Sequence, residues 1–475
     1  MTGRAVLVTI VTAVGFVTML YFIVLNTLYL LFSVGAFFRL RQHRHRWTSR
    51  DLDTVMRSSA TLGISLVVPA FNEAITVADS VRALLLLNDP QFEVVVINDG
   101  ASDQSMAVLI ETFGLNRAPV TYLQPIVTQP IAGCYRSVTH RNLVVLDKAN
   151  GGKADSINAG INAARYPLVC VIDADSSLEE HALTRAVLPF LEDPDTVAAG
   201  GIIRVVNGCT VASGSVMRVG LPGAPLATFQ VVEYPRSFLA ARVTHAWLNA
   251  LLIISGAFGL FRRDALLEAG GFRVDTVGED MEMVTRLNRM YRDSGRRYRI
   301  AFQPEPVCWT EVPESLSVLT TQRRRWQRGI FEVLSYHRAM LANPRYRAAG
   351  LFAMPYYLIF EAVGPLFEIC GYAITIVAVV VGLLDWRFAE RLFLAAVAYG
   401  ALISVMAVVL EEVSFRRYPR TRDLLIFALF GVLENFGYRQ LSTWWRVRGT
   451  LDFLRHKRGW GTMTRKGFAD RNVET

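Results

Sequence analysis

Residues 5–38 carry no charged side chain. The hydrocarbon layer of a membrane is about 30 Å thick and takes about 20 helical residues to cross, so this run suffices for one tilted membrane helix. A cleaved signal peptide is the alternative, but its apolar region is only about 7 to 15 residues long. The whole chain has 475 residues, of which 52% are hydrophobic, which is too apolar for a soluble protein of this size. We therefore expect a membrane protein whose N-terminal helix is retained.

Basic residues follow directly after this run, at Arg39, Arg41, Arg44, Arg46 and Arg50. Such clusters are typical of the cytoplasmic side of a membrane, which places the N-terminus outside. The five cysteines form no CxxC pair, so we expect neither a disulfide framework nor a zinc site, and a reduced cytosolic compartment suits them. The net charge of +9 favours anionic membrane lipids as partners. No nucleic-acid-binding motif is present, so no nucleic-acid partner is expected.

Between about residues 51 and 337 the composition changes to that of a soluble domain. Apolar runs of strand length alternate there with helical patterns, which is typical of an α/β domain with a mostly parallel sheet. The strands are expected at residues 64–68, 93–97, 143–146 and 168–172, and the helices at residues 76–87, 103–113 and 153–164. Open α/β sheets bind ligands at the carboxyl ends of their strands, so functional side chains are expected there.

Polar segments follow three of these strands, at residues 69–73, 98–103 and 173–175. Asp173 and Asp175 are only two residues apart. Such a pair can hold Mg²⁺ or Mn²⁺, because these ions prefer hard oxygen ligands and bridge to substrate phosphates. The third segment therefore predicts a metal and phosphate site.

Two further side chains fit a nucleotide site, each with a structural alternative. Asp99 can accept hydrogen bonds from a base or a ribose, but Asp is also common in turns and helix caps. Lys153 follows two glycines at the start of a predicted helix, where backbone N–H groups and the ammonium could hold an anion. A simple helix-entry turn is the alternative explanation for the segment around Lys153. This segment lacks the spacing of a Walker A loop.

An acidic pair, Glu279 and Asp280, precedes a basic segment that contains Gln322, Arg325 and Trp326. The spacing of these last three residues places them on one face of a helix. Arg325 could neutralise a diphosphate there, and Trp326 could stack on a sugar ring. A basic amphipathic helix on the membrane surface is the alternative, and both interpretations can hold together.

These motifs resemble those of the membrane-integrated family 2 glycosyltransferases, which include cellulose, chitin, hyaluronan and poly-N-acetylglucosamine synthases. The resemblance covers about residues 64–330 and implies a GT-A fold with a Rossmann-like, mostly parallel sheet. It implies that Asp99 contacts the uracil or ribose, that Asp173 and Asp175 form the DxD element for UDP and metal, and that the Lys153 segment lies near the diphosphate. The implied nucleotide-sugar site also includes Pro69, Asn72, Glu73, Gln322, Arg325 and Trp326.

The resemblance further implies that Asp280 is the general base, with Glu279 beside it. Inversion at the anomeric carbon needs one base on the acceptor side and a stabilised leaving group on the other, so one carboxylate and a metal suffice. Ser255 and Gly256 belong to a loop that is similar to the family's acceptor loop, and Trp326 joins them in the implied acceptor site. The loop is closest to that of poly-N-acetylglucosamine synthases, which favours an N-acetylhexosamine donor.

Some residues depart from the family or fit two roles. The family frequently has Thr at the position of Gly278. We expect this difference to affect how the acceptor is positioned. Glu233, Tyr234 and Arg236 resemble a family helix between the metal loop and the acceptor loop. They fit a buried polar anchor and a substrate contact equally well.

Beyond residue 338 the chain becomes apolar again. Prolines and glutamates interrupt residues 350–384, which predicts a broken or interfacial helix leading into a span at 369–384. A further span is expected at 392–410, followed by a basic cytoplasmic loop at 416–420. Residues 424–445 are expected to be interfacial or re-entrant, which gives three full spans. Glu361, Glu434 and Asn435 could face a channel for the growing polymer or could pair helices.

The sequence thus predicts a multi-pass protein of the plasma (bacterial inner) membrane with a cytosolic catalytic domain. The expected divisions are residues 1–50, 51–337, 338–447 and 448–475. We expect transfer from a UDP-sugar to a growing polysaccharide, with secretion of the product and with accessory export subunits as a further partner class. A non-processive transferase acting on a glycolipid or short glycan acceptor is the alternative. A receptor or scaffold that kept the nucleotide fold predicts loss of the carboxylates, and these are present.

Overall fold

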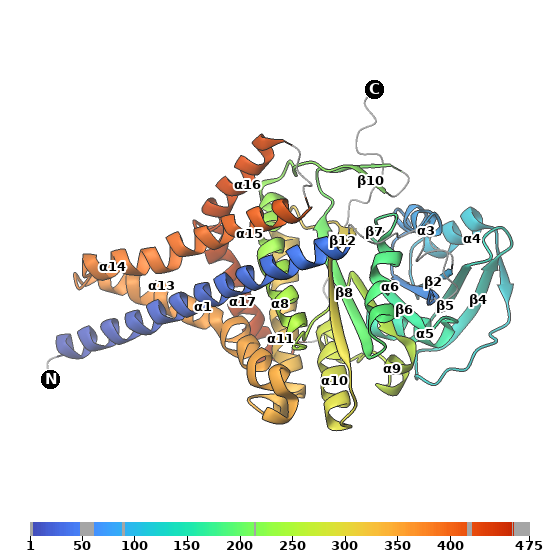
Figure 1. Cartoon of the computed structure of the whole chain (residues 1–475), viewed down its shortest axis with the longest axis horizontal. Coiled ribbons are helices and arrows are strands. Elements are labelled where there is room, and N and C mark those ends of the chain that lie inside the picture. The colour runs from blue at the N-terminus through green and yellow to red at the C-terminus, as the bar shows by residue number, and fades with distance from the viewer. Residues whose placement is uncertain are drawn as a thin grey trace.

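The computed structural model describes residues 3–47, 61–87, 91–212, 215–415, 420–457 and 459. An α/β domain occupies one end of the molecule and a group of long helices occupies the other (Figure 1). Three of the predicted features lie outside the described residues: the domain start at residue 51, most of the basic loop at 416–420 and the basic tail beyond residue 459.

A mixed ten-stranded sheet forms the α/β domain, in the order β3-β4-β5-β2-β1-β6-β11-β8-β12-β7. Its first half confirms the predicted parallel strands, which pair in the order β5-β2-β1-β6. Their residues are almost all buried, as expected for parallel strands covered on both faces. The bounds are β1 (Ile64–Ala70), β2 (Phe92–Asp99), β5 (Leu143–Lys148) and β6 (Leu168–Ile172). The strands β2 and β5 run further than predicted, so Asp99 and Lys148 end strands rather than follow them.

The rest of the sheet was not predicted strand by strand. β11 (Phe258–Arg262) runs antiparallel between β6 and β8 (Thr196–Val205), and β12 (Arg299–Thr310) pairs parallel with β8. The strands β7 (Ser176–Leu178), β3 (Leu115–Ala118) and β4 (Ile131–Ser137) complete it by antiparallel pairing. A separate hairpin consists of β9 (Thr210–Ala212) and β10 (Ser215–Arg218).

Helices cover both faces of the sheet because successive side chains of each strand point to opposite faces. Leu66 and Val68 pack into one core cluster with α3 (Val77–Leu85), α4 (Ser105–Phe113) and α6 (Ala182–Glu192). Val67 packs into the other with α5 (Lys153–Ala163), α9 (Arg263–Glu268) and α10 (Glu279–Asp293). Two buried layers therefore fix the carboxyl ends of β1, β2, β5 and β6 at one edge.

Three helical stretches are long and apolar enough to cross a membrane: Arg4–Gln42, Ala349–Val380 and Trp386–Leu410. The first is a single helix, α1 (Gly3–Trp47), as predicted. The second is interrupted, as predicted, by the π-helical turns η4 (Ala349–Ala353) and η5 (Tyr357–Ala362) on either side of α12 (Met354–Tyr356), and continues as α13 (Gly364–Val380). The third comprises α14 (Trp386–Phe393), η6 (Leu394–Ala398) and most of α15 (Tyr399–Phe415).

Further helices connect these stretches to the α/β domain. The segment α7 (Pro225–Tyr234), η1 (Pro235–Ala240) and α8 (Ala241–Trp247) precedes β11, and α11 (Leu316–Tyr336) follows β12. The predicted interfacial segment 424–445 is two helices, α16 (Thr421–Leu433) and α17 (Tyr438–Leu454). α17 packs closely on α11, where Gly449 faces the backbone of Arg324. Short turns η2 (Arg338–Met340) and η3 (Pro344–Tyr346) lead into η4.

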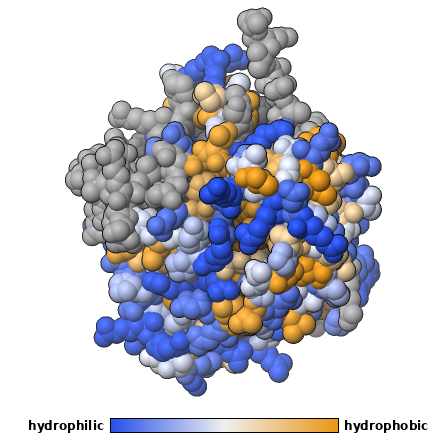
Figure 2. Space-filling model, turned by 90° about the vertical axis from the view of Figure 1, so that its right-hand side faces the viewer, coloured by the Kyte–Doolittle hydropathy of each residue, from blue (hydrophilic) through white to orange (hydrophobic). Residues whose placement is uncertain are grey.

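The end of the α/β domain away from the apolar helices is largely hydrophilic, with hydrophobic residues scattered among the polar ones (Figure 2). In contrast, the helices at the other end expose many large apolar side chains, among them Phe16, Leu20, Val380 and Leu402. This division is typical of a domain in water that is joined to helices in lipid.

Candidate active site

One cavity of about 1300 Å³ lies between the α/β domain and the apolar helices. Its wall is built from the carboxyl ends of β1, β2 and β6, the loop before β11, the start of α10, and α11, and it continues along α1, η5, α13 and α17. Every site residue predicted from the sequence lines this cavity: Pro69, Asn72, Glu73, Asp99, Lys153, Asp173, Asp175, Ser255, Gly256, Glu279, Asp280, Gln322, Arg325 and Trp326.

Asp99 is buried and holds the glycine loop that begins α5. Its carboxylate accepts hydrogen bonds from the backbone N–H groups of Gly151 (2.9 Å) and Gly152 (2.8 Å), and from Lys148 Nζ (2.6 Å). Lys148 also contacts Asp155 Oδ2 at 2.6 Å. Asp99 thus fixes the backbone next to Lys153. Sequence reasoning missed Lys148 and Asp155, although the position of Lys148 at a strand end was a usable signal.

The loops after β1 and β2 are tied together beside Asp99. Asn72 has a φ of 56° and accepts a hydrogen bond from Ser102 N (2.9 Å), while Ala74 N donates to Asp103 Oδ2 (3.0 Å). Partial burial favours the neutral form of Asp103, but hydrogen bonds from Ser105 and Ala74 outweigh it and lower its pKa. The two loops form a stable rim on the nucleotide side of the cavity.

Lys153 lies at the centre of the cavity among three oxygen groups. Its Nζ is 2.5 Å from Asp173 Oδ1 and 3.6 Å from Glu279 Oε1, and it donates to Gly256 O at 3.2 Å. Burial alone would lower the pKa of Lys153, but Asp173 and Glu279 raise it above its ordinary value. Burial raises the pKa of Glu279 to about 7, with Asp280 adding to the effect and Lys153 opposing it. The cluster is therefore both charged and largely shielded from water.

Asp173 and Asp175 fit a divalent cation by the chemistry of their donors. Both follow β6, and carboxylates are the ligands that Mg²⁺ and Mn²⁺ prefer. Within the described ranges, no three Asp, Glu, His or Cys side chains converge as metal ligands. The two carboxylates would thus supply part of a coordination shell, which substrate phosphates and water complete in sites of this kind.

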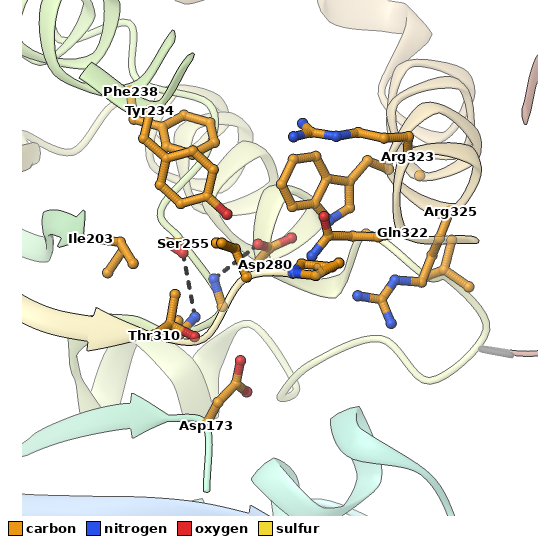
Figure 3. A pocket seen from close by; sticks show the side chains of 18 of the residues that line it. Asp173, Ile203, Tyr234, Phe238, Ser255, Asp280, Thr310, Gln322, Arg323 and Arg325 are labelled. Atoms are coloured by element: carbon orange, nitrogen blue, oxygen red, sulfur yellow. Dashed lines mark hydrogen bonds between the residues drawn. The ribbon is translucent and has the colours of Figure 1, made fainter. Parts of the chain in front are cut away.

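Asp280 is the second residue of α10 and points into the cavity (Figure 3). Its Oδ2 accepts a hydrogen bond from Gly256 N (3.0 Å), and its Oδ1 accepts one from Met281 N (2.8 Å). The carboxylate is thereby held in one orientation while it faces the open space. Chemically, it can accept a proton from a hydroxyl group placed there.

The helix α11 presents Gln322 and Arg325 to the same cavity (Figure 3). Its Arg323 forms a bidentate ion pair with Glu233 at 3.0 and 2.7 Å, and the guanidinium lies 4.6 Å from the ring centroid of Trp326. Glu233 also accepts from Tyr438 Oη at 3.0 Å. The sequence left Glu233 open as a buried polar anchor or a substrate contact. Its contacts with Arg323 and Tyr438 are those of a buried anchor.

The loop before Asp280 is clamped onto α11. Glu332 Oε2 accepts hydrogen bonds from Thr276 Oγ1 (2.8 Å) and Val277 N (3.0 Å). A Cβ on Gly278 would lie 3.1 Å from the Cα of Gly329, so the two backbones touch. At Gly278, where Thr is frequent in the family that the sequence resembles, the close approach to α11 thus leaves little room for a side chain.

Partly buried ion pairs line the part of the cavity between the apolar helices. Arg439 Nη2 lies 3.3 Å from Glu368 Oε1, and Arg446 Nη2 lies 3.0 Å from Glu361 Oε2. A third pair joins η1 to the end of α16, through Arg236 and Glu434. Asn435 instead donates to the carbonyl of Gly431 at 3.1 Å, within its own helix. Glu361 and Glu434, which the sequence left open as channel or helix-pairing residues, line the cavity, and each pairs with an arginine of another helix.

Two family models match this chain. "Glycosyltransferase like family 2" matches residues 136–329, and "Glycosyl transferase family 2" matches residues 65–124. Together they cover more than half of the chain and nearly all of the sheet. The chain belongs to the family 2 glycosyltransferases.

The chain is also similar in sequence to individual proteins. The chain is 29% identical to a poly-beta-1,6-N-acetyl-D-glucosamine synthase of Staphylococcus epidermidis over 272 residues, which are 57% of this chain and 55% of that protein. A synthase of the same name from Staphylococcus aureus strain COL is 28% identical over 273 residues. The match thus spans a little over half the length of these relatives.

A solved structure shows the fold. The mannosyltransferase PcManGT from Pyrobaculum calidifontis, in complex with GDP-Man and Mn²⁺, aligns with a TM-score of 0.54 and 18% identity. The alignment covers 89% of this chain and 99% of that one. The α/β domain has the GT-A fold that the sequence predicts.

Proposed function

We propose that this chain is a membrane-bound inverting glycosyltransferase that transfers N-acetylglucosamine from its UDP conjugate to a growing polysaccharide. The observation that carries the proposal is the single cavity. It joins the carboxylates after β6 to Asp280 and α11, and then continues between the apolar helices. The name of the synthases that match this chain supports the choice of sugar.

The donor occupies the nucleotide side of the cavity in this proposal. Pro69, Asn72 and Glu73 line the pocket for the nucleoside, and Asp99 fixes the loop that carries Lys153. Asp173 and Asp175 would hold Mg²⁺ or Mn²⁺ there, and the metal would neutralise charge on the departing diphosphate. The cationic side chains of Lys153 and Arg325 add to that neutralisation. Gln322 and Trp326 complete the donor site from α11.

The acceptor lies on the side of Asp280. Its hydroxyl attacks the anomeric carbon, the bond from that carbon to the UDP oxygen breaks, and the hydroxyl proton passes to the Asp280 carboxylate. Ser255 and Gly256 form the floor beneath the attacking sugar, and Trp326 offers an aromatic face to it. Glu279 contacts Lys153, and Lys153 donates to the carbonyl of Gly256. Because the N–H of Gly256 donates to Asp280, Glu279 helps indirectly to hold Asp280 in place.

The apolar helices indicate where in the cell the reaction takes place. We assign residues 1–50 to an N-terminal span with its basic border, 51–337 to a cytosolic GT-A domain, 338–447 to interfacial and membrane helices, and 448–475 to a basic tail. The protein would cross the bacterial plasma membrane several times, among anionic lipids. The extension of the cavity between α1, α13 and α17 supports secretion of the product, with accessory export subunits as partners.

A donor screen tests this proposal. Purified protein in lipid is supplied with UDP-glucose, UDP-N-acetylglucosamine, UDP-glucuronate or UDP-galactose, with Mg²⁺ or Mn²⁺, and UDP release and product size are measured. We expect release with UDP-N-acetylglucosamine and a long product. A product extended by a single sugar would favour a non-processive transferase on a lipid or short glycan, and no release with any donor would contradict the proposal.

A further inference from the structure

Four arginines that line the cavity are each neutralised by a glutamate. The pairs are Arg236 with Glu434, Arg323 with Glu233, Arg439 with Glu368 and Arg446 with Glu361. Each guanidinium thus has its counter-ion, so these pairs bring no net charge to the wall. Buried arginines in proteins are normally arranged in this way, because an isolated buried charge is costly.

Arg242 of α8 is different. It lines the same cavity and is only 6% exposed, yet within the part of the chain that the structure describes no carboxylate oxygen lies within 4.0 Å of its guanidinium. The guanidinium instead stacks on Phe238, 4.3 Å from the ring centroid. A guanidinium has five N–H donors and stays charged at any physiological pH, so Arg242 has donors to offer to a ligand.

Arg242 lies close enough to Asp280 for their charges to interact. Burial lowers the pKa of Arg242 below its ordinary value, while the negative charge of Asp280 opposes that effect. The two groups form no direct ion pair within 4.0 Å. Both the proposed base and this arginine line the same open space.

Aromatic rings border that space. Tyr234 and Phe238 lie with their ring centroids 4.7 Å apart, and Phe238 lies 6.3 Å from Trp326. In Figure 3 the hydroxyl of Tyr234 points toward the loop that carries Ser255. Burial raises the pKa of Tyr234 to about 12, so this hydroxyl keeps its proton. Aromatic faces with polar groups at their edges are suited to a sugar ring with its hydroxyls.

The charges near Asp280 bear on whether the acceptor is neutral or carries a phosphate. Once the four ion pairs are set aside, the carboxylates of Glu279 and Asp280 still lie next to each other in the cavity wall, and the charge of Asp280 raises the pKa of Glu279. An uncharged ligand adds nothing to this repulsion. A phosphate group beside Asp280 would add negative charge next to a carboxylate that must itself accept a proton.

We propose that Arg242 is an acceptor-binding residue, whose guanidinium donates hydrogen bonds to the oxygen substituents of an uncharged terminal sugar held against Phe238, Tyr234 and Trp326. This inference rests on the proposed function and narrows its acceptor to a neutral glycan. A lipid phosphate is thereby disfavoured as the group that lies opposite Asp280.

Steady-state kinetics with two variants test the proposal. The acceptor is a short β-1,6-linked N-acetylglucosamine oligomer, and Arg242→Gln is compared with the surface substitution Arg297→Gln, since Arg297 is exposed. Hydrogen bonds to charged groups correspond to about a 10- to 100-fold change in binding, so we expect the acceptor KM of Arg242→Gln to rise by that factor. UDP affinity and the slow hydrolysis of the donor by water should not change. Arg297→Gln should match the wild type.

Several results would overturn the proposal. An unchanged acceptor KM in Arg242→Gln would do so, as would a loss of kcat with a shifted pH profile at constant KM, which would make Arg242 an electrostatic partner of Asp280. If Arg242→Gln does not fold, Arg242→Lys is measured instead and must show the same rise in KM. The wild type must also prefer the neutral oligomer to a lipid monophosphate. A wild type without UDP release would refute the proposed function itself, which is a separate outcome.

Discussion

The backbone of Gly256 contacts both sides of the reaction site. Its carbonyl accepts from Lys153, which in turn contacts Asp173 on the donor side, and its N–H donates to Asp280 on the acceptor side. The sequence predicted Gly256 as an acceptor residue because a small side chain lets a sugar approach the backbone. The structure adds a second reason, since Gly256 lies between the two charged groups that the reaction requires.

Gly256→Ala should therefore damage chemistry more than folding. The added Cβ would lie 3.1 Å from Lys153 Nζ and 3.4 Å from Asp280 Oδ2, which displaces at least one of them. Small displacements of reacting groups can cost about 100-fold in rate, so we expect kcat to fall by about that factor. Gly223→Ala is the control, because a Cβ there meets nothing within 4 Å. UDP release at the wild-type rate by Gly256→Ala would contradict this account.

Glu279 makes stability depend on pH. Its pKa rises from an ordinary 4.5 to about 7 in the folded protein, so the folded state binds this proton more tightly than the unfolded chain does. The resulting contribution to stability is fully present below about pH 4.5 and is lost as the pH rises through about 7. The charged groups that act on it are Lys153, Asp280 and Arg325.

Melting temperatures of the wild type and Glu279→Gln measure this effect. Glutamine keeps the shape of the side chain and cannot titrate, so the variant should gain stability relative to the wild type between pH 5 and pH 8.5. The difference between the two proteins is the relevant quantity, because all other titrating groups are shared. A difference that does not change with pH would show that Glu279 is not titrating in this range.

At the scale of elements, the contact between α11 and the start of α10 sets the geometry of the site. Gly278 and Gly329 bring the two backbones together, and Glu332 fixes the loop between them with two hydrogen bonds. The helix that carries Gln322, Arg325 and Trp326 is in this way held against the residue before Glu279.

Gly329→Ala tests whether this contact matters. Alanine is preferred over glycine inside a helix by about 1 kcal/mol, so a free site would gain stability. Here the Cβ would lie 3.1 Å from the Cα of Gly278, and overpacking of this kind costs about 1 to 3 kcal/mol. We therefore expect a lower melting temperature and a lower kcat. A melting temperature above that of the wild type would contradict the packing argument.

The strands and helices that could be predicted are those with a clear local pattern. The apolar runs of β1, β2, β5 and β6 mark them in the sequence, and all four exist. β11 and β12 could not be found in this way, because β11 contains a glycine and arginine, and β12 is irregular, with register shifts around Pro306. Their pairing depends on tertiary contacts rather than on local sequence.

The candidate site also contains residues that could be predicted from the sequence and residues that could not. Local motifs and the family resemblance that they carry gave all fourteen predicted residues, and each of them lines the cavity. Lys148, Glu332 and Arg242 were missed because their importance comes from partners far away in the chain. Arg242 in particular is notable for a partner that it lacks among the described residues, and no sequence pattern encodes that.

At the scale of the whole molecule, ion pairs join the membrane helices to the catalytic domain. Arg236 of η1 contacts both Ser404 of α15 and Glu434 at the end of α16. Glu434 is only 2% exposed and Arg236 is partly buried, so the carboxylate of this pair is shielded from water. Movement of the membrane helices relative to the domain would have to break these contacts.

Glu434→Gln should destabilise the protein strongly. Removing one partner of a buried pair leaves an uncompensated charge and costs about 3 to 5 kcal/mol. Replacing both partners, as in Arg236→Met with Glu434→Leu, should recover much of that loss because no charge remains buried. Thermal unfolding in detergent measures both variants. Equal stability of the single and double variants would contradict the assignment of a buried pair.

The central claim is that Asp280 takes the acceptor proton during transfer from a UDP-sugar, and substitution of that one oxygen tests it most directly. Asp280→Asn is compared with the wild type in lipid nanodiscs, by UDP binding and by incorporation of labelled N-acetylglucosamine into product. Asparagine is nearly isosteric but cannot accept the proton, so we predict unchanged UDP affinity and at least about a 100-fold loss of incorporation. Incorporation by Asp280→Asn at the wild-type rate would contradict the account.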